Sequence, residues 1–286
     1  MSRPAFVGVD GRRVRVRVDG DADKPPVLLV HGIGRSLEDW DPQYERLSAD
    51  YRVIAVDVPG FGFSDRPEGP ITLSAFANGV LGAVDVLGEQ RPLHIVGNSL
   101  GGAIAMQVLA QRPERVASLA LINSAGFGRE VTILLRILAM PVLGPLASRR
   151  TTRATATMLE RSCYADTALA SRERIDRAMA IAAKPHHGQV MLAAAVELAT
   201  ARGVKAGWRR QLAAFAALHP RPAMVIWGDQ DKVLPAHHLE EARRVLPHAE
   251  THLLPGIGHM PQIECPDEFA ALVLPFLDRA SRAAVG

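Results

Sequence analysis

A serine between two glycines, at the junction of an apolar run and a run of helix-forming residues, constrains this chain most. Residues 93–96 predict a buried strand, and residues 103–111 predict a helix. The turn Gly97-Asn98-Ser99-Leu100-Gly101 matches the pattern G-x-S-x-G in the strand–turn–helix context that gives it meaning. So abrupt a turn forces its apex residue into a sparsely allowed conformation, and a Cβ on either glycine would strike the adjoining strand or helix. We therefore expect the Ser99 hydroxyl to stand clear of the sheet at a helix N-terminus, where N–H groups favour negative charge.

Further apolar runs alternate along the chain with segments of helical spacing. Runs typical of buried strands lie at residues 26–30 and 51–56, and further strands are expected at residues 116–122, 223–227 and 250–254. Helical spacing occurs at residues 40–47, 74–87, 239–245 and 267–279, with Ser74 as a cap residue. This alternation predicts an α/β fold with a mainly parallel sheet and helices on both faces. Alternating residues on either side of Asp10-Gly11 predict a hairpin that adds an antiparallel edge.

The rhythm changes between residues 127 and 215, where the sequence shows no convincing strand. Helical spacing is found there at residues 131–138, 152–160, 175–183 and 190–201. We call residues 127–215 the inserted segment and expect an all-helical cap that sits over the core. Residues 1–126 and 216–286 then form that core.

Composition excludes several classes of function. The 286 residues fit one α/β core with an insertion. Lys and Arg number 33 against 30 Asp and Glu, and the arginines are scattered, which argues against a nucleic-acid partner. Cys163 and Cys265 match no metal or redox spacing and indicate free thiols in a reducing compartment.

The sequence also predicts where the protein resides. The N-terminus has no apolar run typical of a secretory signal. The most apolar stretch, residues 131–147, is interrupted by Arg136, Pro141 and Pro145 and is too short for a membrane span. We expect a cytoplasmic protein without a transmembrane segment, whose partner is a largely apolar small molecule.

Three of the predicted strands lead into residues that carry chemistry, and in an open parallel sheet such groups collect at the carboxyl ends of strands. Ser99 follows one strand, Asp229 and Asp231 follow the strand at 223–227, and His259 follows the strand at 250–254. A serine needs a base to take its proton, an imidazole does this near neutral pH, and a carboxylate holds the second ring nitrogen. The pattern predicts Ser99 as nucleophile, His259 as base and Asp231 as the orienting acid, with Asp229 as a competing carboxylate.

An oxyanion site completes this chemistry. The N–H of Leu100, directly after the nucleophile, is one expected donor. The second is expected from the loop His31-Gly32-Ile33-Gly34, which follows the strand at 26–30, and we choose the N–H of Ile33. Such donors are each worth roughly 3 kcal/mol of transition-state stabilisation. The chemistry needs no cofactor, and no His, Cys and Asp cluster shows metal-ligand spacing.

Five segments in this order resemble the α/β-hydrolase superfamily, in its capped, lipase/esterase-like branch. They are HGIG at 31–34, DVPGFGFSD at 57–65, VGNSLGG at 96–102, WGDQDKVLP at 227–235 and GHMPQIECP at 258–266. The resemblance implies Ser99, Asp231 and His259 as the triad, with Ile33 and Leu100 as oxyanion donors, and it places the acid three residues after Gly228. Haloalkane dehalogenases and epoxide hydrolases of this superfamily have Asp at the elbow, so Ser99 argues against both.

The elbow is similar to that of hydrolases that cleave C–C bonds in meta-cleavage products of aromatic degradation. Those enzymes usually have Trp directly after the catalytic His, where this chain has Met260. One of the arginines of the inserted segment could hold a substrate carboxylate, although a solvated face is the simpler interpretation; they are Arg136, Arg149, Arg150 and Arg153.

Other polar and apolar residues have structural interpretations. Asp57 and Ser64 are expected to shape a turn, His31 to brace the oxyanion loop and His94 to lie hydrogen-bonded in the core. Exposed positions are expected for His186 and His187, with a pocket contact as the alternative, and for His237, His238, His248 and His252. Apolar residues of the inserted segment line a pocket or pack against the core; they are Leu134, Leu135, Leu138, Met140, Leu143 and Leu146.

These observations favour a serine hydrolase that cleaves a small to medium apolar carboxylic ester through an acyl-enzyme. One alternative keeps the triad and cleaves a C–C bond in a dienoic acid of the meta-cleavage type. A second alternative is a non-catalytic ligand receptor on a hydrolase scaffold, because such a protein could retain every motif.

Overall fold

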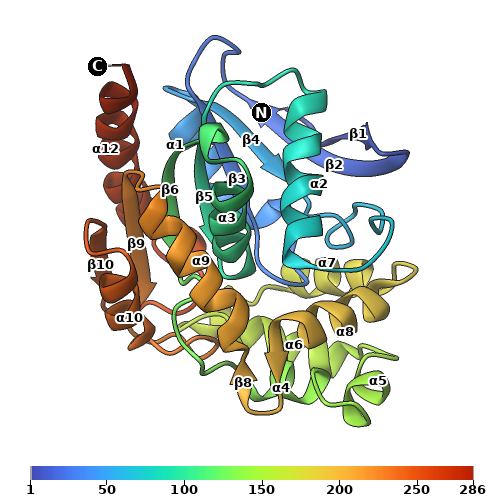
Figure 1. Ribbon diagram of the computed structural model, residues 1–286. Coiled ribbons are helices and arrows are strands. Elements are labelled where there is room, and N and C mark those ends of the chain that lie inside the picture. Colours follow the sequence, from blue (N-terminus) through green and yellow to red (C-terminus); the bar gives the residue numbers. More distant parts are fainter. Residues whose placement is uncertain (1, 286) are drawn as a thin grey trace.

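The computed structural model describes residues 2–285, and its centre is one eight-stranded sheet with helices on both faces (Figure 1). The strand order is β1-β2-β4-β3-β5-β6-β9-β10. All neighbours from β4 to β10 pair in parallel, whereas β1–β2 and β2–β4 pair antiparallel. The strands are β1 (Ala5–Val9), β2 (Arg12–Asp19), β3 (Pro26–Val30), β4 (Arg52–Val56), β5 (Leu93–Asn98), β6 (Val116–Ile122), β9 (Ala223–Gly228) and β10 (Glu250–Leu254). The predicted fold class and the antiparallel edge are confirmed.

Strand β3 shows why the sheet strands read as unbroken apolar runs. All five of its residues are buried. Val27 and Leu29 belong to the core on one face of the sheet, and Leu28 and Val30 to the core on the other. A strand covered on both faces needs an apolar side chain at every position, and alternation is lost.

The helices divide between the two faces. Helices α2 (Leu73–Val86), α3 (Leu100–Gln111), α9 (Ala206–Leu218) and α10 (His238–Val245) contribute to one apolar core, and α1 (Asp41–Ser48) and α12 (Pro266–Val285) to the other. Helix α2 begins one residue before the predicted cap, because the Thr72 side chain accepts the Ala75 N–H at 3.0 Å. Ser74 is thus not the cap residue. Short helical turns lie at Leu37–Trp40, Pro113–Arg115, Thr167–Leu169 and α11 (Pro261–Glu264).

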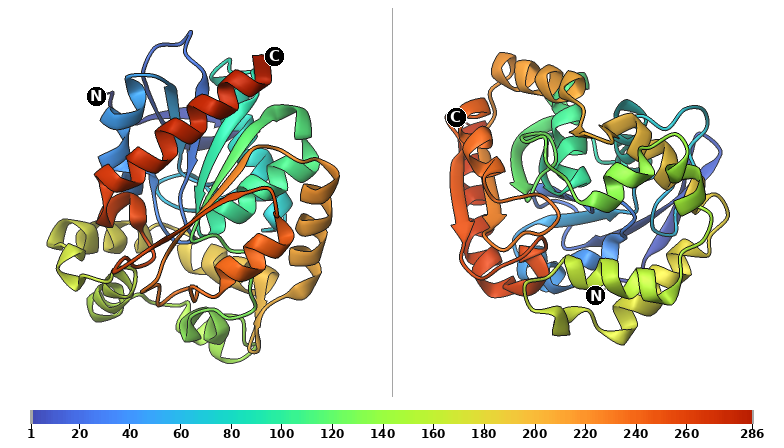
Figure 2. Two further views of the ribbon diagram at one scale, coloured as in Figure 1. Left: turned by 90° about the vertical axis from the view of Figure 1, so that its left-hand side faces the viewer. Right: turned by 90° about the horizontal axis from the view of Figure 1, so that it is seen from below.

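The helices of the inserted segment gather together at one end of the sheet (Figures 1 and 2). They are α4 (Ile133–Leu138), α5 (Leu143–Ala147), α6 (Arg153–Ser162), α7 (Arg172–Ala182) and α8 (His187–Leu198). The segment is not entirely helical, because β7 (Ala199–Thr200) and β8 (Gly203–Val204) form a small hairpin. Strands of two residues are too short to leave a periodic pattern in the sequence. The expected boundary at residue 215 falls inside α9, which packs against α3 and α10.

Among residues 2–285, no helix combines the length and the apolar character that crossing a membrane requires.

His94 ties β5 to the C-terminal helix. Its ring lies 2.8 Å from the Ser118 hydroxyl and 2.9 Å from the hydroxyl of Ser281 on α12. It is the hydrogen-bonded core histidine that the sequence predicts. Burial lowers its pKa to about 4 from an ordinary value of 6.5.

We predict that this histidine makes the protein less stable in mild acid. Between pH 6.5 and 4 the unfolded chain binds a proton at His94 that the folded chain excludes, so the free energy of unfolding falls as the pH falls. Between pH 7 and 5 the loss from this group is roughly 2 kcal/mol. Urea unfolding at both pH values should show a smaller loss for His94→Gln than for the parent. The same substitution at exposed His248 should leave the loss unchanged; equal losses in all three proteins would refute the prediction.

Candidate active site

Ser99 is the single residue between β5 and α3, and its backbone conformation is strained. Its φ is 55° and its ψ is −115°, a region that side-chain-bearing residues rarely adopt. The glycines on either side make the turn sterically possible. A Cβ on Gly97 would lie 2.3 Å from the Gly101 carbonyl oxygen, and one on Gly101 would lie 2.1 Å from the Val30 carbonyl oxygen. Both glycines therefore allow β5, α3 and β3 to approach at backbone distance.

His259 and Asp231 form a buried pair. The Nδ1 atom of His259 lies 2.7 Å from Oδ2 of Asp231, and the carboxylate is fully enclosed. Its other oxygen, Oδ1, accepts the N–H groups of Val233 at 2.7 Å and Leu234 at 3.0 Å. Asp229, the competing carboxylate, is exposed and accepts the Gly256 N–H at 2.7 Å instead. Of the two carboxylates, only Asp231 contacts the histidine.

Asn123 is a member of this network that the sequence analysis missed. Its side-chain amide donates to Asp231 Oδ2 at 2.6 Å and to the Gly258 carbonyl oxygen at 3.2 Å. It directly follows β6 and has a φ of 42°, a backbone conformation that Asn tolerates better than most residues. The rule that functional groups collect at the carboxyl ends of strands could have identified it.

Hydrogen bonds to the backbone of the His259 loop hold it beside the elbow. The Asn98 side chain, directly before Ser99, donates to the His259 carbonyl oxygen at 3.0 Å. The His259 N–H donates to the Cys163 carbonyl oxygen of the inserted segment at 2.9 Å. Glu264 Oε1 accepts the N–H groups of Gly258 at 3.0 Å and Met260 at 3.2 Å, one on each side of the histidine. Three separate parts of the chain thus position this loop.

The two residues expected to donate to an oxyanion, Ile33 and Leu100, lie close to Ser99. Leu100 is the first residue of α3, where a backbone N–H has no intrahelical acceptor. The loop after β3 touches the elbow, because a Cβ on Gly32 would lie 3.3 Å from Ser99 Cβ. Ile33, the next residue, lines the same cavity as Ser99 and His259.

His31 braces the oxyanion loop, and its hydrogen bonds define its tautomer. Its Nε2 lies 3.0 Å from the Val58 backbone nitrogen, which can only donate, so Nε2 accepts and Nδ1 carries the proton. That Nδ1–H donates to the Gly32 carbonyl oxygen at 2.7 Å. Asp57 likewise accepts the N–H groups of Leu37 and Phe63, each at 2.7 Å. Both residues support loops, as the sequence predicts.

A cavity of about 210 Å³ lies between the sheet and the inserted segment. Ser99 and His259 line its core side, where they are 7% and 4% exposed. Its apolar walls include Leu134, Leu135, Leu138, Leu159, Met191, Val233 and Met260. Cys163 also lines it, but burial raises the pKa of this thiol to about 12, so the thiol stays protonated near neutral pH.

Comparison with known proteins gives a consistent result. The model of the alpha/beta hydrolase family matches residues 27–272. The chain belongs to this family. It is similar to a 2-hydroxy-6-oxononadienedioate/2-hydroxy-6-oxononatrienedioate hydrolase from a Pseudomonas species, with 30% identity over 93% of this chain and 92% of the relative. It is also similar to a dihydrolipoyllysine-residue acetyltransferase component of an acetoin cleaving system from Pseudomonas putida, with 31% identity over 96% of this chain and 69% of the relative.

Among solved structures, the fold resembles that of a meta-cleavage product hydrolase from Pseudomonas fluorescens IP01. The TM-score is 0.79 at 25% identity, and the match covers 96% of this chain and 98% of the other. The chain is therefore a hydrolase enzyme that acts on a small molecule.

An ion cluster joins the oxyanion loop of this hydrolase to the inserted segment. Arg35, two residues after Ile33, contacts Asp39 Oδ1 at 2.7 Å and also pairs with Glu160 on α6. Tyr164 donates its hydroxyl to Glu160 at 2.7 Å. Burial opposes ionisation of Glu160, but the adjacent guanidinium of Arg35 outweighs it and holds the pKa of the carboxyl below its ordinary value. Sequence analysis missed this cluster, because no local pattern links Arg35 to Glu160.

Some of the other residues singled out in the sequence line the cavity, and others lie on the surface or in the core. Leu134, Leu135 and Leu138 line the cavity, but Leu143 and Leu146 are exposed. Exposed Arg150 lies at the cavity wall, as does His187, whereas His186 is exposed. The surface assignment is wrong for His238, which is 1% exposed and packs edge-on against Trp227, and His252 is half-buried.

We predict that Glu160→Gln lowers the free energy of unfolding by about 3 kcal/mol at neutral pH, because it removes one partner of a buried ion pair. Because the folded pKa of Glu160 is lowered, its contribution is present above the ordinary carboxyl value and is lost as the pH falls through the folded pKa. Denaturant unfolding of parent and variant should therefore converge in acid. Glu173→Gln, which removes an exposed partner of Arg177, should change stability by less than about 1 kcal/mol. Equal effects of the two variants would contradict the prediction.

Proposed function

We propose that this hydrolase cleaves a small to medium, largely apolar carboxylic ester, with Ser99 as nucleophile, His259 as base and Asp231 as the acid. The observation that carries the proposal is the buried His259–Asp231 pair, whose imidazole lines the same cavity as the strained serine. A carboxylate bound at Nδ1 keeps the proton there and leaves Nε2 free to act as a base.

The proposed reaction proceeds in two steps. His259 takes the Ser99 hydroxyl proton while the oxygen attacks the ester carbonyl, and the N–H groups of Ile33 and Leu100 stabilise the oxyanion. The imidazolium then donates its proton to the departing alkoxide, which leaves an acyl-enzyme. In the second step His259 activates a water molecule, the acyl bond breaks and Ser99 regains its proton.

The cavity supports an apolar substrate. Apolar groups form most of the exposed wall, among them leucine, methionine and valine side chains, and the guanidinium of Arg35 pairs with Asp39 and Glu160. We propose that residues 127–215 act as a cap domain over the core formed by residues 1–126 and 216–286. The lining of one cavity by both parts supports this division. Two free cysteines support a cytoplasmic location.

C–C bond hydrolysis of the meta-cleavage type is the second candidate. The activities after which two similar proteins are named support it, and so does Arg150, which lies at the cavity wall where a substrate carboxylate could pair with it. Met260, where those hydrolases usually have Trp, favours the ester.

We predict that Ser99→Ala lowers turnover of p-nitrophenyl esters by roughly 10⁴-fold or more, because the nucleophile is lost. Far-UV circular dichroism should show an intact fold. A fluorophosphonate probe should label the parent at residue 99 and leave the variant unlabelled. Turnover that survives the substitution would refute the serine mechanism.

Substrate preference separates the two candidates. The parent enzyme is assayed against an ester chain-length series and against a 2-hydroxy-6-oxo-dienoate. We expect higher kcat/KM for an ester. A higher value for the dienoate, together with its loss in Arg150→Gln, would instead establish the C–C reaction.

We predict that Asn123→Ala lowers kcat roughly tenfold or more and moves the acidic limb of the kcat/KM profile to higher pH. Loss of the amide donor leaves the negative charge of Asp231 less compensated, so this charge stabilises the His259 imidazolium more strongly and the base is lost at higher pH, by about one unit. Asp229→Asn, in the same loop as Asp231 but bonded to Gly256, should leave the profile in place. Loss of activity without a shift would assign Asn123 a purely structural role.

A further inference from the structure

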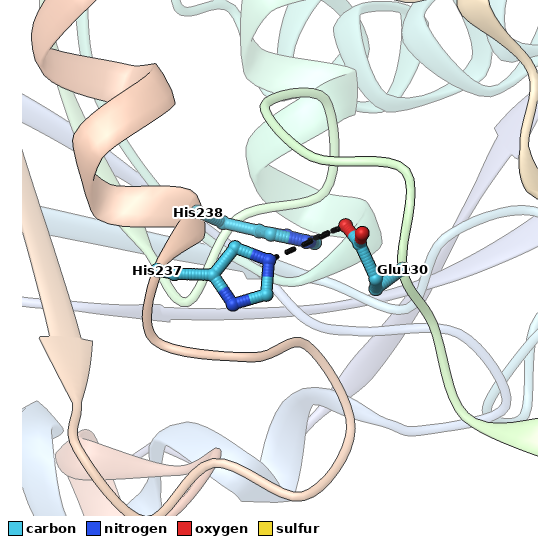
Figure 3. Close-up of side chains that lie close together, drawn as sticks. All are labelled: Glu130, His237 and His238. Carbon is cyan, nitrogen blue, oxygen red and sulfur yellow. Dashed lines mark hydrogen bonds and ion pairs between the residues drawn. The ribbon is translucent and has the colours of Figure 1, made fainter.

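Three potential metal ligands converge outside the catalytic cavity (Figure 3). The Glu130 Oε2 atom lies 3.1 Å from His238 Nε2 and 3.4 Å from His237 Nε2. All three ligand atoms lie within 4.8 Å of one another. Glu130 belongs to the connection between β6 and α4, whereas the histidines stand at the start of α10, 108 positions along the chain from Glu130 to His238.

The buried member of this group is held in place by close packing. The His238 side chain is 1% exposed, and its ring packs edge-on against Trp227 at 5.9 Å between centroids. Gly128 lies so close to the ring that a Cβ there would lie 1.9 Å from His238 Nε2. His237 and Glu130 are 61% and 57% exposed, which leaves the site open to solvent on one side. One ligand is thus rigid, and two can adjust to an ion.

Two of the three distances between the ligand atoms are close to those of a metal site, and the third, between the two histidine rings, is within 4.8 Å. In a tetrahedral zinc site with ligands at 2.0–2.1 Å, two ligand atoms are about 3.3 Å apart. The two distances from Glu130 to the histidine rings lie close to this value. Two imidazole nitrogens and one carboxylate oxygen form a ligand set that zinc uses, with water in the fourth position.

We propose that Glu130, His237 and His238 bind a divalent transition-metal ion of the Zn²⁺ type. The ion clamps the start of the inserted segment to the loop that carries Asp231. The same two chain segments already meet through the Thr132 N–H, which donates to the Val233 carbonyl oxygen at 3.0 Å. Metal coordination adds a second link between these segments, at His238, five residues after Val233. Because an ion that binds only the folded chain stabilises it, the site couples metal concentration to stability.

Titration calorimetry with Zn²⁺ tests the site on an untagged Ser99→Ala protein, so the result does not depend on the proposed ester chemistry. We expect one bound equivalent and a rise of several degrees in the melting temperature. With Co²⁺ as the probe, the visible spectrum should show the intense bands of tetrahedral coordination.

His237→Ala is the decisive variant, because it removes a ligand that is largely outside the core. Loss of a group that only orients a ligand weakens metal binding roughly 10- to 100-fold, so loss of the ligand itself should do at least as much. Glu130→Gln should behave alike, and His248→Ala, an exposed histidine elsewhere, should bind as the parent does. Absence of stoichiometric binding, or unchanged affinity in His237→Ala, overturns the site. Binding without a rise in melting temperature overturns the clamp.

Discussion

Close backbone contact at the elbow is the constraint on which the rest of the structure depends. Besides Gly97 and Gly101, Gly102 lies so near the chain after β6 that a Cβ there would be 2.1 Å from Ser124 Oγ. Any side chain at these positions would push α3 away from β3, β5 and the chain after β6. The strain at Ser99 persists because β5 is paired on both sides, with β3 and β6. The elbow therefore places Ser99 in the wall of the cavity that His259 also lines.

Buried hydrogen bonds convert this placement into a defined arrangement. Asp231 accepts from a ring nitrogen, an amide side chain and two backbone N–H groups, so its carboxylate has little freedom. Asn98 connects the elbow to the histidine loop, and Asn123 connects that loop to the acid. Such a network orients each group through its neighbours, and the loss of one partner leaves another buried group unpaired. The inserted segment takes part through Cys163 and the Arg35–Glu160 pair.

The core strands and the elbow could be predicted because their causes are local. Burial on both faces gives unbroken apolar runs such as Pro26–Val30, and a strained turn demands glycine at fixed offsets. The surface assignment of His238 failed for the opposite reason. Its burial depends on Gly128 and Trp227, which approach only in the folded chain, and helix α10 is otherwise polar enough to predict exposure. The position of Asn123 directly after a strand could have identified it as a site residue, whereas no local pattern pointed to Glu160.

By itself the sequence determined the core strands and most of the helices between them, the sharp turn at Ser99 and the candidate residues Asp231 and His259, because each follows from a pattern within a short window. Tertiary structure alone decided that Asn123 and Glu264 hold the Asp231–His259 pair and its loop, and that Glu130 meets His237 and His238. These contacts join residues far apart in the chain. Their geometry depends on how strand ends and loops pack, and a linear pattern carries no information on that packing.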